Sequence, residues 1–346
     1  MNNPLKNDLE DIIKLTDPFI WAQMKDKKIF ITGGTGFFGS WLLESFYYSN
    51  QVHELNSKIV VLTRNPEKFK TKAPHLFQTG AICLLEGDVK DFDFPEGHYD
   101  YIIHAATEAS ESLNNSKPFE MMDTIVTGTR RVLEFARAST AERLLFVSSG
   151  AVYGKQPQSI SHISEDSMTG PDILNFRNVY AESKRLAELM CCIYAENYGI
   201  TIPIARCFAF VGPHLNLNIH FAIGNFIRDG LVGQTIEVKG DGTPVRSYLY
   251  SADLVIWLLT ILVNGESKRA YNVGSDHAIS IEELAKKICQ CFDHKKIEYI
   301  VRQKSDPRKE REHYVPSIDR ARKELKLNVN FDLAESIKKT INWNSN

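Results

Sequence analysis

The chain has 346 residues, enough for one large domain or two modest ones, and its 43% hydrophobic and 24% charged residues are typical of a soluble globular protein. Its formal net charge of −2 carries no basic excess, which argues against a nucleic-acid-binding protein. No apolar run approaches the roughly 20 residues of a membrane span, and acidic residues stand where a signal peptide needs basic and then apolar ones. We therefore expect a cytoplasmic protein that binds neither nucleic acid nor membrane.

The six cysteines lie among apolar or mixed patterns, at positions 83, 191, 192, 207, 289 and 291. Cys289 and Cys291 form a C-x-C pair, but they lack the second pair of ligands that a metal site requires. We expect buried thiols in a reducing compartment and no metal.

Short apolar runs alternate with helical patterns along most of the chain. Residues 5–24 have helical spacing and predict that 1–26 form a helical extension packed on the fold. The predicted strands are 27–32, 58–63, 81–88, 100–106, 143–149 and 202–208. Near-continuous apolar strands separated by helices indicate a parallel sheet covered on both faces. The sequence thus predicts a Rossmann-type, doubly wound α/β fold with ligands at the carboxyl ends of the strands.

The pattern changes after about Pro213 to short strands and helices with many polar interruptions. Residues 224–233 and 280–292 read as helices, 235–250 as a strand, a loop and a strand, and 254–263 as a buried helix. We expect 27–212 to bind the cofactor and 213–346 to form a smaller substrate-binding α/β lobe, with some interleaving of segments.

A glycine-rich turn, ITGGTGFFGSW, joins the first predicted strand to a helix, with glycines at 33, 34, 36 and 39. A turn without Cβ atoms lets a pyrophosphate approach the N–H groups at the helix N-terminus, and the last glycine allows close helix–strand packing. Because this turn follows a strand and opens a helix, it predicts a dinucleotide-binding site.

The second strand ends at Thr63 and Arg64, where a carboxylate usually holds the adenosine ribose. An arginine pairs with a 2′-phosphate instead. We therefore favour NADP, as NADPH, over NAD, although Arg64 can also stack on adenine or remain solvated. Asp88 and Val89, at the third strand's end, are candidates to line the adenine, and Asp88 is also a good turn residue.

Tyr180 and Lys184 are four residues apart on a predicted helix and share one face, and Ser149 ends an earlier strand. Hydride transfer to a ketone places negative charge on oxygen, which needs a proton donor and a hydrogen bond. A nearby ammonium favours the phenolate of a tyrosine. Tyr180 is thus the candidate acid and base, Lys184 tunes it and holds the nicotinamide ribose, and Ser149 binds the reacting oxygen. Ser148 is expected to be structural.

Together, TGGTGFFG, the DV pair at 88–89, HAA at 104–106, SSGAVYG, YAESK and RSYLYSADL resemble the extended short-chain dehydrogenases/reductases, and more narrowly their nucleotide-sugar epimerase/dehydratase group. The resemblance covers residues 27–340. It implies the catalytic triad Ser149, Tyr180 and Lys184. The cofactor residues that it implies are Gly33, Thr35, Gly36, Phe37, Phe38, Gly39, Arg64, Asp88, Val89, Ala105, Ala106, Tyr180 and Lys184.

The same resemblance implies a nucleotide diphosphate sugar, dTDP-, UDP-, CDP- or GDP-linked, bound by the C-terminal lobe. Asn225 lies where the group contacts the diphosphate, and Arg246 and Arg308 lie where arginines hold it. Val238 is on the strand that passes the nucleobase, where Lys239 can also reach. The resemblance further suggests a homodimer through a four-helix bundle that includes the Tyr180 helix.

Ser149 is followed by Gly150 and Ala151, and here this sequence departs from the pattern of the group's dehydratases. Those enzymes have an Asp-Glu pair there that eliminates water, and UDP-glucuronate decarboxylases have a glutamate in the second place. Glycine and alanine transfer no proton, so dehydratase and decarboxylase reactions are disfavoured. Ile125 and Ala209 stand where asparagines are frequent, which indicates a differently shaped sugar pocket.

What remains is chemistry that needs only hydride transfer and the triad. The leading prediction is an NADPH-dependent reductase of a nucleotide-linked 4-keto-6-deoxy sugar. The alternative is a nucleotide-sugar epimerase that holds NAD tightly. A non-catalytic NAD(P) sensor is the least favoured, because the triad is intact.

Overall fold

The computed structural model describes residues 3–107, 111–219, 221–292, 296–306, 308 and 310–345, without the side chains of 111–113. The chain forms two compact units, each built from separated segments. The first unit contains 1–152, 172–206 and 255–271, and the second contains 153–171, 207–254 and 272–346. The chain therefore crosses between the units several times; the sequence suggested a main boundary at 212/213 with some interleaving of segments.

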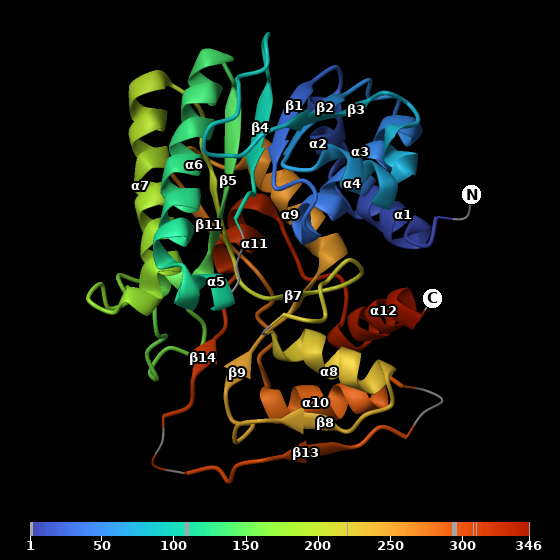
Figure 1. The fold of residues 1–346 in the computed structure, drawn as a ribbon, viewed down its shortest axis with the longest axis vertical. Helices are drawn as coiled ribbons and strands as arrows, with labels where there is room; N and C mark the ends of the chain where they lie inside the picture. Colours follow the sequence, from blue (N-terminus) through green and yellow to red (C-terminus); the bar gives the residue numbers. More distant parts are fainter. Residues whose placement is uncertain are drawn as a thin grey trace. The chain divides into compact units, whose positions relative to one another are not determined.

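A seven-stranded sheet forms the centre of the first unit (Figure 1). Its strands are β1 (Lys28–Thr32), β2 (Lys58–Thr63), β3 (Ile82–Glu86), β4 (Tyr101–His104), β5 (Arg143–Ser149), β6 (Ile204–Cys207) and β11 (Ala270–Val273). Their order is β11-β6-β5-β4-β1-β2-β3, and the pairs β1–β2, β1–β4, β2–β3 and β4–β5 are parallel. The predicted Rossmann-type sheet is confirmed. Strand order reverses between β1 and β4, the point where such sheets bind ligands.

Helices follow or precede these strands as the alternating pattern predicted. They are α1 (Lys6–Leu15), α2 (Pro18–Met24), α3 (Phe37–Val52), α4 (Pro66–Lys72), α5 (Glu111–Ser116), α6 (Pro118–Ala138), α7 (Val179–Tyr198) and α9 (Ser251–Asn264). Short 3₁₀ helices span Pro74–Phe77, Gly150–Tyr153 and Phe176–Asn178. The apolar helix expected at 254–263 is α9, and its side chains are buried. No helix in the described ranges is long and apolar enough to cross a membrane.

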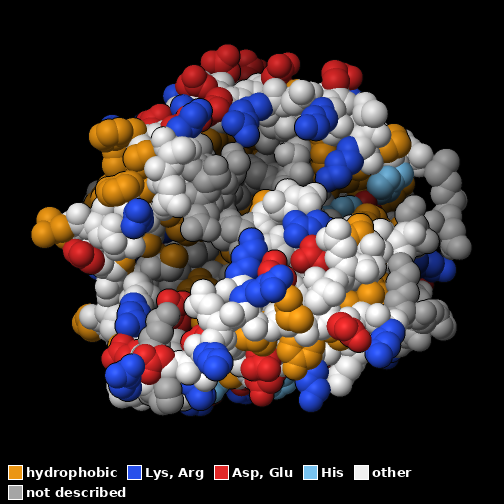
Figure 2. Space-filling model, turned by 60° about the horizontal axis from the view of Figure 1, so that its bottom comes forward, with side chains coloured by type: hydrophobic (Ala, Val, Ile, Leu, Met, Phe, Trp, Pro, Cys, Tyr) orange, Lys and Arg blue, Asp and Glu red, His pale blue; other side chains and the backbone are white. Residues whose placement is uncertain are grey.

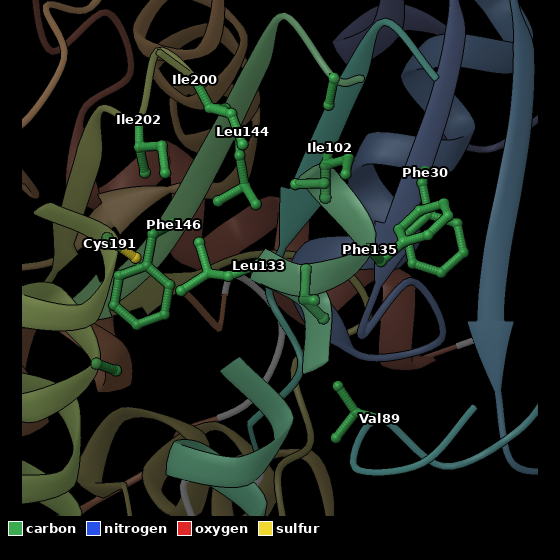
Figure 3. Close-up of a cluster of buried hydrophobic side chains, with 14 of the residues drawn as sticks. Phe30, Val89, Ile102, Leu133, Phe135, Leu144, Phe146, Cys191, Ile200 and Ile202 are labelled. Atoms are coloured by element: carbon green, nitrogen blue, oxygen red, sulfur yellow. The ribbon is translucent and has the colours of Figure 1, made fainter. Parts of the chain in front are cut away.

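One hydrophobic core fills the space between the sheet and the paired helices α6 and α7 (Figure 3). Phe30, Ile102 and Leu144 extend into it from β1, β4 and β5, while Leu133 of α6 and Cys191 of α7 face them. Apolar residues at this density exclude water from the side of the sheet on which α7 lies. The core thus holds α7, which carries two of the candidate catalytic residues, against the sheet.

In its described residues, the second unit is built from short strands and four further helices. The helices are α8 (Ala222–Leu231), α10 (Ile281–Gln290), α11 (Asp319–Leu325) and α12 (Leu333–Ser345). The strands are β7 (Phe210–Val211), β8 (Ile236–Val238), β9 (Val245–Arg246), β10 (Leu249–Tyr250), β12 (Ile279–Ser280), β13 (Tyr299–Val301) and β14 (His313–Tyr314). A separate core joins α8, α10 and α12 to β8. Ser280 and Glu283 form a capping box that starts α10, as the polar start of that segment allows.

Candidate active site

The glycine turn after β1 lies in direct backbone contact with its neighbours. Gly33 has φ +72°, and a Cβ placed there would be 2.5 Å from the carbonyl oxygen of Ala105, just after β4. A Cβ on Gly39 would be 2.2 Å from the Cα of Gly34. Real Cβ atoms do not approach other atoms so closely, so larger residues would push the turn away from β4 and α3. The expected need for glycine at these positions is therefore explained by packing.

The N-terminus of α3 is suited to an anion. The helix follows Gly36, which has no side chain to cap the first N–H groups, and Thr35, Phe37 and Phe38 beside it are half-buried. Uncapped N–H groups and the helix dipole attract a phosphate at this end. The cradle left by the glycines and this bare helix end together fit the diphosphate of a dinucleotide.

The residues expected around the adenosine have different surroundings. Arg64 follows β2, is exposed, and has no ion-pair partner among the described residues. Val89 is buried against Gly128 of α6 and belongs to the core. Asp88 accepts a hydrogen bond from the N–H of Lys90 at 3.0 Å, which shapes the turn after β3. Arg64 remains available to a ligand, whereas Asp88 and Val89 already have structural roles.

Ser149 lies at the end of β5, and Tyr180 lies at the start of α7. Ser149 is the last residue of β5, and its Oγ accepts a hydrogen bond from the N–H of Ala151 at 3.2 Å. Tyr180 lies in the first turn of α7, where the side chain of Asn114 accepts a bond from its backbone N–H at 3.2 Å. The phenol ring is half-buried.

Lys184 is anchored at the carboxyl edge of the sheet. Its Nζ donates to the carbonyl oxygen of Val147 at 2.8 Å and to Oγ1 of Thr107 at 2.9 Å, and the residue is only 3% exposed. The ammonium thus stays in place, with oxygen acceptors, one turn below Tyr180 on the same helix. That arrangement allows a fixed positive charge to stabilise a phenolate.

Ser148 has the structural role that we expected. Its Oγ donates to Glu188 at 2.6 Å, and Glu188 also forms a two-pronged pair with Arg206, with N–O distances of 3.0 and 2.7 Å. Glu188 follows Lys184 by four residues, so α7 directs Lys184 and Glu188 toward β5, and Tyr180 precedes them on the helix at the same spacing. The sequence analysis missed Glu188, although its spacing could have indicated it.

No proton-transferring side chain directly follows Ser149. Gly150 and Ala151 begin a 3₁₀ helix, and the N–H of Ala151 is used to bind the Ser149 hydroxyl. This local turn holds the serine hydroxyl in place. It offers nothing to eliminate water or to protonate a carbon.

The expected substrate residues lie in the second unit. Asn225 of α8 accepts a hydrogen bond from Arg228 at 3.2 Å, and Arg246 of β9 forms an ion pair with Glu312 at 3.2 Å. Arg308 is exposed and pairs with Asp306 at 3.1 Å. Both arginines are therefore held by carboxylates in the same charged stretch.

Three apolar positions in the expected site are part of the packing. The side chain of Val238 is 2% exposed and lies in the second core, whereas Lys239 beside it is exposed. Ile125, in α6, is buried in the first core, and Ala209 packs against the second core. Ile125 and Ala209 therefore contribute apolar contacts to the two cores. Lys239 is the exposed side chain at the end of β8.

The sequence matches the model of the family described as "NAD dependent epimerase/dehydratase family" over residues 29–274. A relative from Xenopus tropicalis, UDP-glucuronic acid decarboxylase 1, is 30% identical over 331 residues, which cover 94% of this chain and 74% of that protein. The family description and the name of this relative concern epimerases, dehydratases and decarboxylases of nucleotide sugars, and neither supports the keto-sugar reductase that the sequence favoured, so we no longer retain it.

Solved structures share the fold. UDP-N-acetylglucosamine 4-epimerase from Methanobrevibacter ruminantium, in complex with UDP-N-acetylmuramic acid, has a TM-score of 0.78 at 21% identity and covers 92% of this chain and 98% of its own. UDP-glucuronic acid 4-epimerase from Bacillus cereus, in complex with NAD and a fluorinated UDP-glucuronic acid, has a TM-score of 0.75 at 21% identity and covers 91% and 98%.

The Rossmann-type sheet, the glycine turn opening α3 and the match over most of the chain agree with one another. The chain belongs to the NAD-dependent epimerase/dehydratase family, the extended short-chain dehydrogenases/reductases that act on nucleotide sugars.

Proposed function

We propose that this protein is a nucleotide-sugar 4-epimerase that uses tightly held NAD and acts on a UDP-linked sugar, with UDP-glucuronic acid as the first candidate. The observation that carries the proposal is the combination of an anchored Ser149, Tyr180 and Lys184 with a turn at Gly150 and Ala151 that has no acid or base. The named relatives support a UDP-linked uronic acid.

The chain's own residues would handle the proton of the reacting hydroxyl. Ser149 would donate a hydrogen bond to the sugar oxygen, and Tyr180 would take its proton and later return it. Lys184 would stabilise the phenolate and hold the nicotinamide ribose. When bound, NAD supplies an acceptor for the hydride of the carbinol carbon and can give it back. A hydride returned to the opposite face of the ketone inverts that carbon with no net redox change.

Decarboxylation is the second candidate, because the relative from Xenopus is named for it. A ketone at C4 places the C6 carboxylate in the β-position, from which carbon dioxide leaves readily. The carbanion left at C5 must then be protonated, and the position that carries glutamate in such decarboxylases is Ala151 here. The missing acid therefore favours epimerisation.

The family description and the neighbour's bound NAD support NAD as the cofactor rather than the NADP that Arg64 suggested. Under this proposal Arg64, which is exposed, contacts the adenosine or stays in solvent. Arg246 and Arg308 would exchange their carboxylate partners for the diphosphate of the substrate, because a phosphate pairs with a guanidinium more strongly than an exposed carboxylate does.

We also propose that the protein is a homodimer through the outward faces of α6 and α7. These two helices expose large apolar side chains, namely Phe119, Met122, Leu186, Leu189 and Ile193. Hydrophobic side chains gather at the left edge of Figure 2, the side on which Figure 1 draws α7. Such a concentration of exposed apolar area is typical of an interface.

One incubation tests the proposed reaction. The purified protein is mixed with UDP-glucuronic acid, and the products are identified by NMR and mass spectrometry, with Tyr180→Phe as the control. A C4 epimer of unchanged mass, with no net reduction of the cofactor, supports the proposal. A UDP-pentose with released carbon dioxide would assign the decarboxylase instead. No turnover of any UDP-linked sugar would overturn the proposal.

A further inference from the structure

A fully buried imidazole lies at the carboxyl edge of the sheet, close to the anchored lysine. His104 is the last residue of β4 and pairs in register with Thr32, the last residue of β1. It therefore occupies the strand-order reversal, directly before the segment that packs against Gly33. The sequence analysis used this residue only as part of the HAA motif.

Both ring nitrogens of His104 have hydroxyl partners. Nδ1 lies 2.7 Å from Oγ1 of Thr32, and Nε2 lies 3.1 Å from Oγ1 of Thr129 in α6. Burial, and secondly the charge of Lys184, lowers the pKa of the ring to about 3. The ring is thus neutral at physiological pH, with one nitrogen donating and the other accepting. A neutral ring adds no second positive charge beside Lys184.

Hydrogen bonds connect this imidazole to Lys184. The hydroxyl of Thr32 accepts a bond from the N–H of Ala106 at 3.2 Å, so the ring and the backbone share one hydroxyl. Oγ1 of Thr107 donates to the carbonyl oxygen of Ala106 at 2.6 Å, and the same hydroxyl accepts a hydrogen bond from Nζ of Lys184 at 2.9 Å. The order is therefore His104, Thr32, Ala106, Thr107 and Lys184.

We propose that His104 is a positioning residue, which orients the Thr32 hydroxyl so that the segment after β4 holds Lys184 and the dinucleotide in place. The proposal rests on the proposed function for the role of Lys184. The bond to Thr32 is the functional one, because only that side of the ring leads to Ala106. The bond to Thr129 fastens the ring to α6 and supplies stability.

Substitutions of His104 can separate the effect of the hydrogen bond to Thr32 from that of the hydrogen bond to Thr129. An asparagine amide reaches about as far as Nδ1 and can keep the bond to Thr32, whereas a glutamine amide reaches about as far as Nε2 and can keep the bond to Thr129. We expect His104→Asn to keep kcat and the dissociation constant of NAD within about threefold of the wild type. We expect His104→Gln to worsen each by about tenfold, since small displacements of a catalytic group are costly.

The unfolding midpoints of both variants serve as the control for a merely structural role. Both substitutions remove the same buried ring, so a structural role predicts that activity and NAD binding fall together with stability. Equal losses in His104→Asn and His104→Gln would overturn the proposal. If the wild type turns over no UDP-linked sugar, the proposed function fails, and the NAD dissociation constants still decide the role of His104.

A second pair of variants covers the case in which substitutions of His104 do not fold. Thr32→Ser keeps the hydroxyl and Thr32→Val removes it with little change in volume, while Thr129→Val removes the other partner of the ring. We expect only Thr32→Val to weaken NAD binding, by about tenfold. A loss in Thr129→Val as large as in Thr32→Val would contradict the assigned path.

Discussion

The polar side chains at the carboxyl edge of the first unit's sheet and the arginines of the second unit are held by different kinds of contact. Lys184 is buried and bonded to a backbone carbonyl and a hydroxyl, and Ser149 is bonded to the turn that follows it. Arg246 and Arg308 instead pair with Glu312 and with the nearby Asp306 in an exposed, charged stretch. Lys184 and Ser149, which would assist proton transfer by Tyr180, are thus hydrogen-bonded within the protein itself, whereas the arginines that would hold the diphosphate can exchange partners. Preorganisation matters most where charge develops in the transition state.

The largest effect on turnover should come from the substitution of Tyr180, the group proposed to transfer the proton. Tyr180→Phe removes one hydroxyl from a half-buried side chain, so we expect the fold and NAD binding to persist and kcat to fall by about 10²–10⁴. Turnover and bound NAD are measured on the same preparation. Retained activity would show that another group moves the proton.

The glycine turn offers a matched pair of substitutions at positive φ. Gly33→Ala places a Cβ against the backbone of Ala105, whereas Gly80→Ala, at φ +68°, meets nothing within 4 Å. We expect Gly33→Ala to lose most of its bound NAD and Gly80→Ala to keep it, with a similar cost of the left-handed backbone in both. Bound NAD is quantified after denaturation. Equal retention in both variants would separate the turn from cofactor binding.

Substitution of the arginines proposed to hold the diphosphate should have a smaller effect, which falls on substrate affinity. Arg246→Ala should weaken UDP binding by about tenfold, because one charge-assisted pair with the diphosphate is lost. Arg302→Ala, which removes another exposed arginine paired with Glu237, is the control and should change binding little. Calorimetric titration with UDP measures both. Equal affinities would remove Arg246 from the diphosphate site.

The smallest effect is expected at the adenosine end. Arg64 is exposed, and NAD has no 2′-phosphate for it to bind, so Arg64→Ala should change the NAD dissociation constant by no more than about threefold. The same variant should bind NADP more weakly than the wild type does. A wild type that binds NADP more tightly than NAD would restore the preference first inferred from this arginine.

The sequence predicted those strands, turns and helix faces that depend on residues close together in the chain. Near-continuous apolar runs marked the strands from β1 to β6, and the glycine spacing marked the turn before α3, because both depend on neighbouring residues. The four-residue spacing of Tyr180 and Lys184 likewise placed them on one helix face, which α7 confirms. The reaction itself was predicted less well, since the sequence favoured a keto-sugar reductase that the family and the named relative do not support.

Contacts between segments far apart in the sequence were not predictable in this way. Thr107 meets Lys184, and Asn114 meets the N–H of Tyr180, only because the fold brings the segment after β4 and α5 to the start of α7. Residues 153–171 belong to the second unit and 255–271 to the first, and no local sequence pattern indicates either assignment. Arg246 likewise pairs with Glu312, which lies 66 residues later in the chain.

The most direct test of the central claim follows the hydrogen at the reacting carbon. A UDP-linked sugar carrying deuterium at C4 is incubated with the purified protein, without added cofactor, and the product is examined by NMR. An epimerase that holds its NAD returns the deuterium to C4, so the account predicts an inverted C4 that has kept it. A product that has lost the deuterium, or a UDP-pentose in place of the epimer, would contradict it.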